Sequence, residues 1–361
     1  MALSITGSRN ATALAINLKS KILFTGGIPV SEYMIKYVDA HVGGESLRLV
    51  LRGPQLKGST LLEKRAYMMR HYDHIRTAVV LEPRGHDDMY GAVLVDPCHP
   101  DADLGVVFID SAYYNNMCGH GSMAIATIAV ELGLVPAVEP VTDVVLETGA
   151  GLVTVKVEVQ GGKAGDAILQ GVPSFLYRNN VLVELERDQV EIAIGFGGNF
   201  FAIVEMEKLG LKHSKEYIQD FIRCGLAIRE YVNNNIPLTH PEKPHINSVE
   251  DILFAKEADF PGDTHKSLVV LGHAMVDRSP CGTGTCARMA MLHQLGKINE
   301  DDIFYHESIT GALFEGKINA LVKVGDFPAV IPQVKGKAYL MGMGTLMIDP
   351  ADPLKHGFSL R

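Results

Sequence analysis

Two cysteines, each followed by Gly-x-Gly, carry the side chains best suited to chemistry in this chain of 361 residues. The segment from Cys118 reads CGHGSMA and the segment from Cys281 reads CGTGTCA, so the cysteine, both glycines, the hydroxyl residue and the alanine coincide without a gap. Both segments reach Leu-Gly at the same distance, at Leu132-Gly133 and at Leu295-Gly296, and Gly is common just beyond a helix. The chain therefore contains an internal repeat whose copies lie 163 residues apart, close to half its length.

The repeated segment has the features of a reactive thiol beside an anion site. A cysteine at the start of a helix lies at the positive end of the helix dipole, where free backbone N–H groups also favour the thiolate. We therefore expect the pKa of both thiols to be lowered. Glycines at the next and third positions let the backbone approach a ligand closely, so the same N–H groups can hold a carboxylate.

Two such motifs facing each other offer a base on one face of a carbon atom and an acid on the other. Removing the α-proton of an amino acid builds negative charge on its carboxylate, and two converging helix starts would stabilise that charge without a metal or pyridoxal phosphate. Because inversion runs in both directions, the acid and the base should be chemically alike, as two thiols are. We predict an amino-acid racemase or epimerase that uses Cys118 and Cys281 and needs no cofactor and no metal.

The remaining pattern indicates how these cysteines are positioned. Each follows an apolar segment with strand character and precedes a helix. We expect strands at 46–52, 77–81, 91–96, 104–109, 144–159 and 268–271, and helices at 61–71, after Cys118, at 215–233 and after Cys281. The helix after Cys118 is apolar on nearly every face, as is typical of a helix at the centre of a lobe, whereas the second helix departs from it at Arg288, His293 and Gln294.

These elements predict a strand-rich α/β (α+β) fold of two pseudo-symmetric lobes. Each lobe would wrap a mixed, barrel-like sheet around a central helix, and the two glycine loops would meet at a cleft. We assign residues 1–33 to an N-terminal extension, 34–160 with 340–361 to the first lobe, and 161–339 to the second.

Composition favours a small-molecule partner. The chain has 33 basic and 42 acidic residues, no Trp and no basic run, so it lacks the electrostatic footprint of a nucleic-acid binder. No apolar stretch approaches the roughly 20 residues needed to span a bilayer, so we expect no membrane partner.

Cysteine usage indicates a reducing compartment. Five scattered cysteines do not resemble a disulfide framework, and we interpret Cys98, Cys224 and Cys286 as structural because none opens a glycine-rich helix. We therefore expect a cytoplasmic protein. Residues 1–31 contain basic, Ser, Thr and Ala residues but no acidic side chain, so organelle targeting is the alternative.

Four stretches strongly resemble the proline racemase family. They are MCGHG at 117–121, DRSPCGTGT at 277–285, EPRGHDDMYG at 82–91 and FGGNFFA at 196–202. The likeness runs from about Lys36 to the end of the chain.

The resemblance implies a two-lobed fold like that of diaminopimelate epimerase, a homodimer, and no cofactor. It also implies proton acceptor and donor roles for Cys118 and Cys281, and contacts between the substrate amine and Asp277 and His120. Backbone contacts to the substrate carboxylate are implied for Gly119, His120, Gly282 and Thr283.

The family contains proline racemases, hydroxyproline 2-epimerases and trans-3-hydroxyproline dehydratases. Dehydratases of the family carry threonine in place of the second cysteine, so Cys281 argues against that branch, and the stretch at 84–90 favours proline over 4-hydroxyproline. Leu271 and Tyr90, however, replace pocket phenylalanines of proline racemases, and Asp251 falls near a third pocket position. Because Tyr90 or Asp251 could bond a ring hydroxyl, a 4- or 3-hydroxyproline epimerase is the alternative to a proline racemase.

A dinucleotide-binding oxidoreductase is the main competing hypothesis from another class. Residues 119–124 fit the fingerprint G-x-G-x-x-A after a strand and before a helix. An acidic ribose partner should follow about 20 residues later, where 136–142 is instead typical of a loop. Residues 311–317 resemble a phosphate-binding loop, but Ile318 replaces its metal-binding hydroxyl, which favours a turn between strands.

Two further hypotheses fit less well. A zinc site formed by Cys118, His120, Cys281 and Cys286 would lack the paired short spacings of structural zinc sites. A cysteine hydrolase would need a histidine base with an orienting third residue, and it would leave Cys281 without a role.

Overall fold

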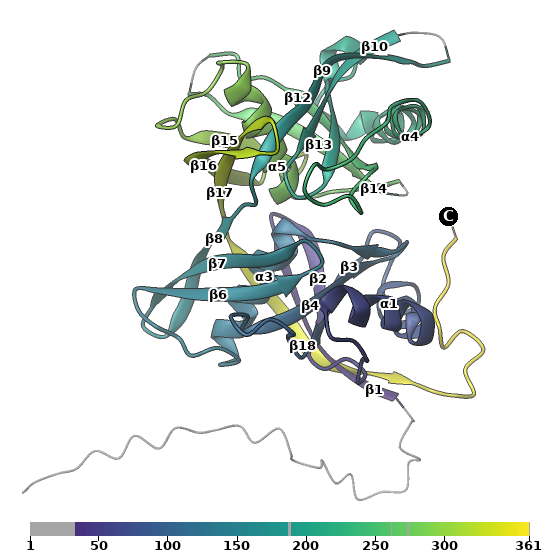
Figure 1. Ribbon diagram of the computed structural model, residues 1–361. Coiled ribbons are helices and arrows are strands. Elements are labelled where there is room, and N and C mark those ends of the chain that lie inside the picture. Colours follow the sequence, from purple (N-terminus) through teal and green to yellow (C-terminus); the bar gives the residue numbers. More distant parts are fainter. Residues whose placement is uncertain (1–32, 187–188, 261, 273, 361) are drawn as a thin grey trace, which may run out of the picture.

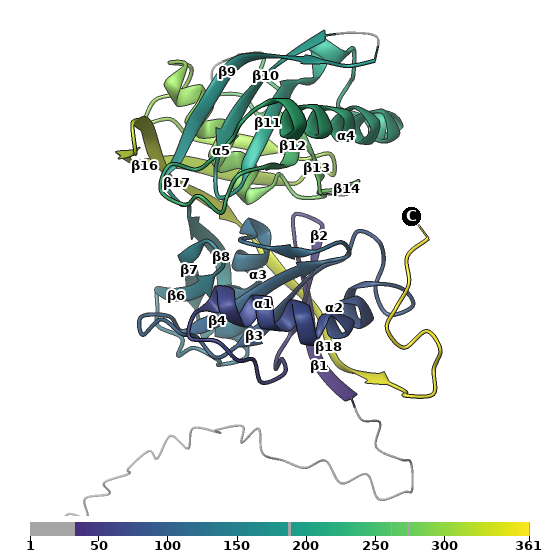
Figure 2. The ribbon, with the colours of Figure 1, turned by 45° about the vertical axis from the view of Figure 1, so that its right-hand side comes forward.

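The computed structural model describes residues 33–186, 189–260, 262–272 and 274–360. Figure 1 shows two lobes, with helix α3 (Gly119–Glu131) inside one and helix α5 (Gly282–Gln294) inside the other. The turned view of Figure 2 shows the same two bodies. The segment for which targeting was considered, 1–31, lies outside the described residues.

The first lobe is built from nine strands within the described part of the chain. They are β1 (Tyr33–Val42), β2 (Glu45–Val50), β3 (Tyr90–Val95), β4 (Leu104–Asp110), β5 (Tyr114–Asn115), β6 (Val141–Thr148), β7 (Gly151–Gln160), β8 (Lys163–Gln170) and the C-terminal β18 (Ala338–Ile348). Side chains of β6 and β7 alternate between buried and more exposed, so one face of this hairpin packs inward, and both strands contact α3.

The second lobe holds the other nine described strands. They are β9 (Ser174–Glu184), β10 (Gln189–Phe196), β11 (Phe200–Glu205), β12 (Val249–Lys256), β13 (His265–Leu271), β14 (Met275–Val276), β15 (Phe304–Glu307), β16 (Leu313–Val324) and β17 (Phe327–Gly336).

The internal repeat extends to the pairing of the strands. Strand β4 pairs antiparallel with β3 and β5 and parallel with β6, and β13 pairs antiparallel with β12 and β14 and parallel with β15. The parallel pair of β2 and β3 likewise has its counterpart in β11 and β12. The sequence repeat around the cysteines therefore reflects a repeated topology.

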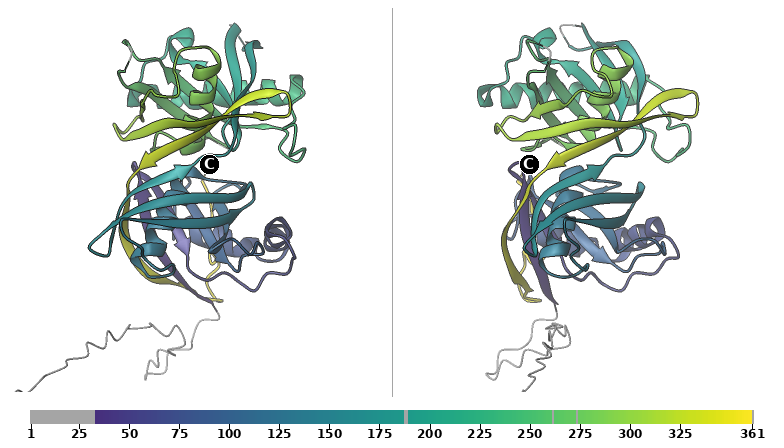
Figure 3. Two further views of the ribbon diagram at one scale, coloured as in Figure 1. Left: turned by 60° about the vertical axis from the view of Figure 1, so that its left-hand side comes forward. Right: turned by 90° about the vertical axis from the view of Figure 1, so that its left-hand side faces the viewer.

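The lobes differ in how their sheets close. In the second lobe the pairings run β9, β10, β11, β12, β13, β15, β16, β17 and back to β9, which makes a closed barrel of eight strands among the described residues. Strand β17 also pairs with β8 of the first lobe. Figure 3 shows the chain passing between the lobes near this pairing, from β8 to β9 and from β17 to β18. The predicted mixed α/β fold is confirmed.

Each central helix is surrounded by strands, which explains its composition. Every residue of α3 from Gly119 to Val130 is buried, because strands of the first lobe contact the helix on several sides. In α5 the buried Arg288 is accommodated by an ion pair with Glu205, at 2.6 Å between nitrogen and oxygen. Gly133 and Gly296 follow the two helices with φ of +64° and +68°, as their predicted role at the helix end requires.

Other helices lie outside these centres. They are α1 (Leu61–His71), α2 (Asp73–Val80), α4 (Ile218–Asn235) and the short 3-10 turns η1 (Met206–Leu209) and η2 (Lys215–Tyr217). The predicted helices at 61–71 and 215–233 are confirmed. No described helix is both long and apolar enough to cross a membrane.

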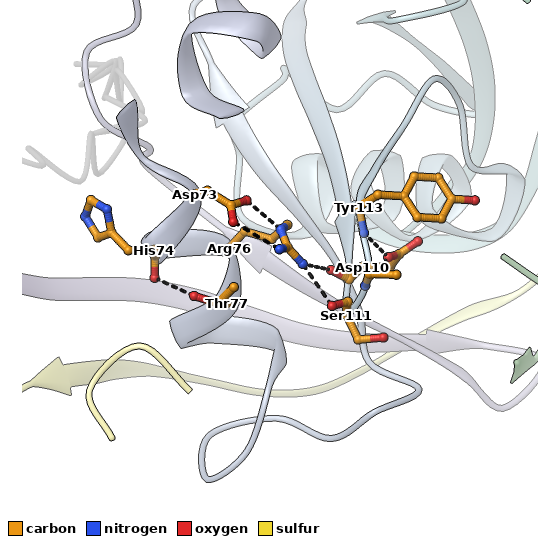
Figure 4. A network of polar contacts seen from close by, with 8 residues as sticks. Asp73, His74, Arg76, Thr77, Asp110, Ser111 and Tyr113 are labelled. Atoms are coloured by element: carbon orange, nitrogen blue, oxygen red, sulfur yellow. Dashed lines mark hydrogen bonds and ion pairs between the residues drawn. The ribbon is translucent and has the colours of Figure 1, made fainter. Parts of the chain in front are cut away.

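The predicted strand at 77–81 is wrong, since these residues belong mostly to α2. Figure 4 shows the reason: Arg76 reaches from α2 to the end of β4, donating to the backbone oxygens of Asp110 and Ser111, both at 2.9 Å. Arg76 also pairs with Asp73 one turn earlier, at 2.7 Å. These tertiary contacts outweigh the strand propensity of a short β-branched run.

Candidate active site

The two repeated segments form matching helix starts. Cys118 is the N-cap of α3 and its Sγ accepts a hydrogen bond from Gly121 N at 3.3 Å. Cys281 is the N-cap of α5 and its Sγ accepts from Gly284 N at 3.4 Å. A methyl group on either glycine would lie 3.0 to 3.2 Å from the cysteine sulfur, so the second glycine of each motif makes room for the thiol.

The first glycine of each motif brings the two helix starts together. A Cβ atom built on Gly119 would lie 2.7 Å from the Cα atom of Gly282, and one built on Gly282 would lie 2.9 Å from the Cα atom of Gly119. Real Cβ atoms do not approach backbone so closely, so only glycine permits this crossing. The two helix N-termini therefore meet directly at the junction of the lobes.

A pocket with an empty volume of about 270 Å³ opens at this crossing. The pocket is small, and its mixture of thiols, carboxyl groups and backbone suits a small polar molecule. All residues expected from the sequence line it, namely Tyr90, Cys118, Gly119, His120, Leu271, Asp277, Cys281, Gly282 and Thr283. Both cysteines are thus exposed to one shared space.

Three further lining residues are Met117, Asn199 and Asp251. Asp251 was expected only near a pocket position, and no role was predicted for Asn199 or Met117. The sequence does contain one signal for Asn199, which is the Gly-Gly pair before it. The structure explains this pair, since a Cβ atom on Gly197 would lie 2.2 Å from the carbonyl oxygen of Thr283. The loop before Asn199 therefore packs directly on the start of α5.

The expectation of lowered thiol pKa values is wrong for this site. Burial raises the pKa of Cys118 well above its ordinary value, and the nearby carboxylate of Asp277 raises it further, although the Gly121 amide opposes both effects. Burial, followed by the charges of Asp277 and Asp251, likewise raises the pKa of Cys281. Loss of solvation outweighs the helix N-terminus here, so both groups are thiols at neutral pH.

The thiol of Cys118 has a histidine partner. Its Sγ lies 3.3 Å from His120 Nδ1, and His120 Nε2 lies 3.4 Å from the carbonyl oxygen of Ser46. Burial lowers the pKa of His120, so the ring is neutral. Since a carbonyl can only accept, the tautomer with its hydrogen on Nε2 fits both contacts and leaves Nδ1 to accept from the thiol.

The thiol of Cys281 has different partners. Its Sγ lies 3.6 Å from Thr283 Oγ1, the residue that corresponds to His120 in the repeat. Asp277 is buried nearby, and its Oδ1 accepts from Ser279 N at 2.8 Å. Burial raises the pKa of Asp277, while His120 and hydrogen bonds from Ser279 and Cys281 lower it. Asp277 is therefore a buried carboxyl group that interacts with Cys281 and His120 and raises the pKa of both thiols.

The rest of the pocket wall is unusually polar for a buried surface. Asp251 Oδ1 accepts from Gly272 N at 3.2 Å, and its Oδ2 lies 3.5 Å from Asn199 Nδ2. The Asn199 Oδ1 atom is buried and has no hydrogen-bond partner among the described residues. Burial, followed by the charge of Glu250, raises the pKa of Asp251 well above its ordinary value, and burial does the same for the Tyr90 hydroxyl.

The remaining cysteines and motifs lie elsewhere. Cys98, Cys224 and Cys286 are free thiols away from the pocket, and burial raises the pKa of Cys286 to about 12. The loop considered for phosphate, 311–317, is a turn followed by the start of β16, as expected. In the part of the chain that the structure describes, no cluster of three or more His, Cys, Asp or Glu is arranged to hold a metal ion.

Comparison with known proteins agrees with this geometry. The family model described as proline racemase matches residues 37–359. A proline racemase from Clostridioides difficile is 44% identical over 329 residues, which cover 91% of this chain and 98% of that protein. The chain belongs to the proline racemase family. This confirms the predicted family and the predicted class of enzyme, an isomerase of the proline racemase type.

Proteins of this family with different activities are similar to the chain. A 4-hydroxyproline epimerase from Brucella suis is 40% identical, and the match covers 90% of this chain and 97% of that protein. A trans-3-hydroxy-L-proline dehydratase from Burkholderia cenocepacia is 39% identical with the same coverage. Overall identity therefore does not separate the substrates.

Solved structures agree with the fold. A hydroxyproline epimerase from Agrobacterium vitis with bound trans-4-hydroxy-L-proline superposes with a TM-score of 0.86 at 28% identity, covering 92% of this chain and 96% of that one. A PhzF-family phenazine biosynthesis protein from Bacillus anthracis has a TM-score of 0.54 at 12% identity, covering 88% of this chain and 100% of that one. The second likeness is one of fold alone.

Proposed function

We propose that the protein interconverts L- and D-proline, with Cys118 and Cys281 exchanging protons at opposite faces of the α-carbon. The observation that carries this proposal is the crossing at Gly119 and Gly282, which turns both N-cap thiols toward one small pocket. In each turnover one sulfur, which starts as a thiolate, takes the α-proton. The other sulfur, which starts as a thiol, delivers its proton to the opposite face of the α-carbon. The reaction then leaves the two sulfurs with exchanged protonation states, ready for the reverse direction.

The helix starts supply the site for the substrate carboxylate. The amides of Gly121 and Gly284 are already engaged by the thiols, so the carboxylate takes the N–H groups of Gly119, His120, Gly282 and Thr283. These donors stabilise the negative charge that develops on the carboxylate as the α-proton leaves. Glycine at the first position keeps them accessible.

The substrate amine brings a positive charge into a site where burial and the charge of Asp277 disfavour both thiolates. Its ammonium binds Asp277, with His120 close by, and offsets the carboxylate that raises the pKa of both cysteines. Binding of the zwitterionic amino acid therefore lets one of the two thiols release its proton to solvent, so that turnover begins with one thiolate and one thiol. The neutral His120 provides a route for the Cys118 proton through Nδ1.

A hydroxyproline 2-epimerase is the second candidate, favoured by the polar wall of the pocket. Tyr90, Asn199 and Asp251 are polar side chains that can form hydrogen bonds with a ring hydroxyl. A wall built for hydrogen bonds discriminates strongly against an analogue that lacks the hydroxyl. The same cysteine chemistry would then invert a 4- or 3-hydroxyproline at its α-carbon.

A cofactor-free substrate panel tests both candidates. Purified protein, extensively dialysed, is incubated with L-proline, trans-4-hydroxy-L-proline and trans-3-hydroxy-L-proline, and the products are resolved by chiral chromatography. If the protein is a proline racemase, the kcat/KM for inversion should be highest for proline. If it is a hydroxyproline 2-epimerase, the kcat/KM should be highest for one of the hydroxyprolines. Loss of water from trans-3-hydroxy-L-proline would support a dehydratase, and absence of any reaction together with tight binding of a nicotinamide nucleotide would support the oxidoreductase.

The proposal also covers the fold likeness, the division into lobes and the oligomeric state. We infer a likeness to diaminopimelate epimerase and a homodimer. The lobe boundaries predicted at 160 and 340 shift slightly, because the first lobe also contains β8 (Lys163–Gln170) and the start of β18 at Ala338. The family resemblance supports the dimer, and sedimentation of the purified protein tests it. The five free thiols support a cytoplasmic site of action.

A further inference from the structure

The hairpin of β1 and β2 reaches across the junction of the lobes. Its turn consists of Gly43 and Gly44, whose φ angles of +61° and +88° suit glycine in a tight hairpin turn. A Cβ built on Gly43 would lie 3.2 Å from the Cβ of Ser279 and 3.3 Å from Pro280 Cδ. The hairpin tip therefore rests on the segment that leads to Cys281.

Two successive residues at the start of β2 contact the partners of both cysteines. Glu45 Oε2 accepts from Arg278 N at 2.7 Å, and Arg278 follows Asp277 directly. The carbonyl oxygen of Ser46 lies 3.4 Å from Nε2 of His120, the partner of Cys118. One end of a strand thus connects to both halves of the reactive pair.

Further contacts hold the hairpin in this place. Thr310 Oγ1 lies 3.2 Å from the carbonyl oxygen of Gly43 and 2.9 Å from that of Arg278. The Arg278 guanidinium also forms an ion pair with Asp88 of the first lobe, at 2.6 Å. The segment before Cys281 is therefore tied to the first lobe on two sides.

Glu45 is itself a buried carboxyl group that does not line the pocket. Only 1% of Glu45 and 2% of Asp277 is exposed. Burial, followed by the charge of Asp277, raises the pKa of Glu45 well above its ordinary value, with Asp88 adding to this and Arg278 opposing it. Two neighbouring buried carboxyls do not ionise together readily, and a protonated Glu45 still accepts from Arg278 N.

We propose that Glu45 is a positioning residue of the two-thiol reaction, which holds the 277–281 segment, and with it Asp277, through the hydrogen bond from Arg278 N. This inference rests on the proposed function. Because Glu45 and Asp277 are neighbouring buried carboxyls, we also expect Glu45 to stay protonated, since a second negative charge near the sulfur of Cys118 would oppose its ionisation. Glu45 acts through Arg278 and does not touch the substrate.

The test compares Glu45→Gln with Glu45→Ala. Gln keeps an oxygen acceptor for Arg278 N without a titratable proton, whereas Ala leaves that buried N–H without a partner. The matched control is Glu147→Gln, because Glu147 also accepts backbone N–H bonds from a separate segment, at Cys98 and His99, away from the pocket. Each variant is assayed for kcat and KM, and Cys118 and Cys281 are followed separately by alkylation with iodoacetamide as a function of pH.

We expect Glu45→Gln to retain kcat within about threefold. The pH dependence of alkylation should match the wild type for both thiols, and the control should behave in the same way. Glu45→Ala should lower kcat by about 10- to 100-fold, with a smaller change in KM, and alter the alkylation of both cysteines.

Two results would overturn the inference. A shift of the Cys118 profile to lower pH in Glu45→Gln would mean that Glu45 is ionised in the wild type, and unchanged kcat in Glu45→Ala would remove its positioning role. If Glu45→Ala does not fold, the Gln variant still decides the protonation claim. Because alkylation needs no substrate, these outcomes stay distinguishable from failure of the proposed racemisation.

Discussion

The starts of α3 and α5 share a backbone plan but differ in the side chains around each thiol. Both cysteines cap a helix and accept from the amide three residues on, yet Cys118 is extended with φ of −137° while Cys281 has φ of +63°, an uncommon conformation for a residue with a side chain. His120 stands beside one sulfur and Thr283 beside the other. The two thiols are therefore alike in their sulfur atoms and helix starts, and they differ in the side chain that contacts each sulfur.

Removing either sulfur should cause the largest loss of activity. Cys118→Ser and Cys281→Ser should each lower the rate of inversion by about 1,000-fold, because a hydroxyl is a poor base and each turnover needs both groups. Cys224→Ser, on α4 and outside the pocket, is the matched control and should keep full activity. Chiral chromatography of the product gives the rates, and near-normal turnover in one cysteine variant would exclude that sulfur from the chemistry.

Separating the two helix starts should have the next largest effect. Gly119→Ala places a methyl group 2.7 Å from the Gly282 backbone and should lower kcat by about 100-fold, because displacement of about 1 Å spoils the alignment of both thiols. Gly133→Ala is the control, since that position has positive φ but open space around it. Its activity should remain normal although its thermal stability falls, and equal activity loss in both variants would contradict a special role for the crossing.

Much of this site was predictable because it is encoded locally. The cysteine, the two glycines and the Leu-Gly end recur in one register, so the helix starts and their pairing follow from the sequence. The polar wall was harder to predict, since Asn199 reaches the pocket from the turn between β10 and β11 and Asp251 reaches it from β12. Glu45 gave no signal at all, because its importance depends on a backbone amide 233 residues away.

The raised thiol pKa values were not predictable for a related physical reason. Helix position is readable from spacing, but solvation depends on the whole assembly of strands around the two sulfurs. Similarly, the β-branched residues at 77–81 predict a strand, whereas the anchoring of Arg76 to the end of β4, which stabilises α2, is not visible in the sequence.

The partners of the two sulfurs should be separable by single substitutions. Thr283→Val removes a hydrogen bond that lowers the pKa of Cys281, so this thiol should be alkylated about 3- to 10-fold more slowly at a fixed pH while Cys118 is unaffected. His120→Leu removes the nitrogen that accepts from the neutral Cys118 thiol, so Cys118 should be alkylated faster while Cys281 is spared. Quantitative mass spectrometry of the two cysteine peptides measures both rates, and parallel changes at both cysteines in either variant would count against independent environments.

The smallest predicted effect concerns the stability of the second lobe in acid. Burial lowers the pKa of His240, which packs among Phe175, Phe196 and Phe200, to about 4. The folded protein therefore binds this proton less readily than the unfolded chain, and stability is lost as pH falls from about 6.5 toward 4.

Urea unfolding at pH 7.5 and pH 5.0 measures this loss. His240→Asn should reduce the difference in unfolding free energy between the two pH values by about 1 kcal/mol, after allowance for solvent screening. The matched control is His99→Asn, at an exposed histidine outside this aromatic cluster. An identical pH dependence in wild type and His240→Asn would remove His240 as a source of acid sensitivity.

Solvent deuterium provides the most direct test of two thiols acting on opposite faces. L-proline is incubated with the protein in deuterium oxide, and both enantiomers are analysed by mass spectrometry at low conversion. D-proline should carry one deuterium at its α-carbon, and residual L-proline should be almost free of deuterium. The reason is that the thiolate that removes the proton is not the thiol that returns one. Deuterium appearing equally in both enantiomers, or D-proline that retains the substrate proton, would contradict this mechanism.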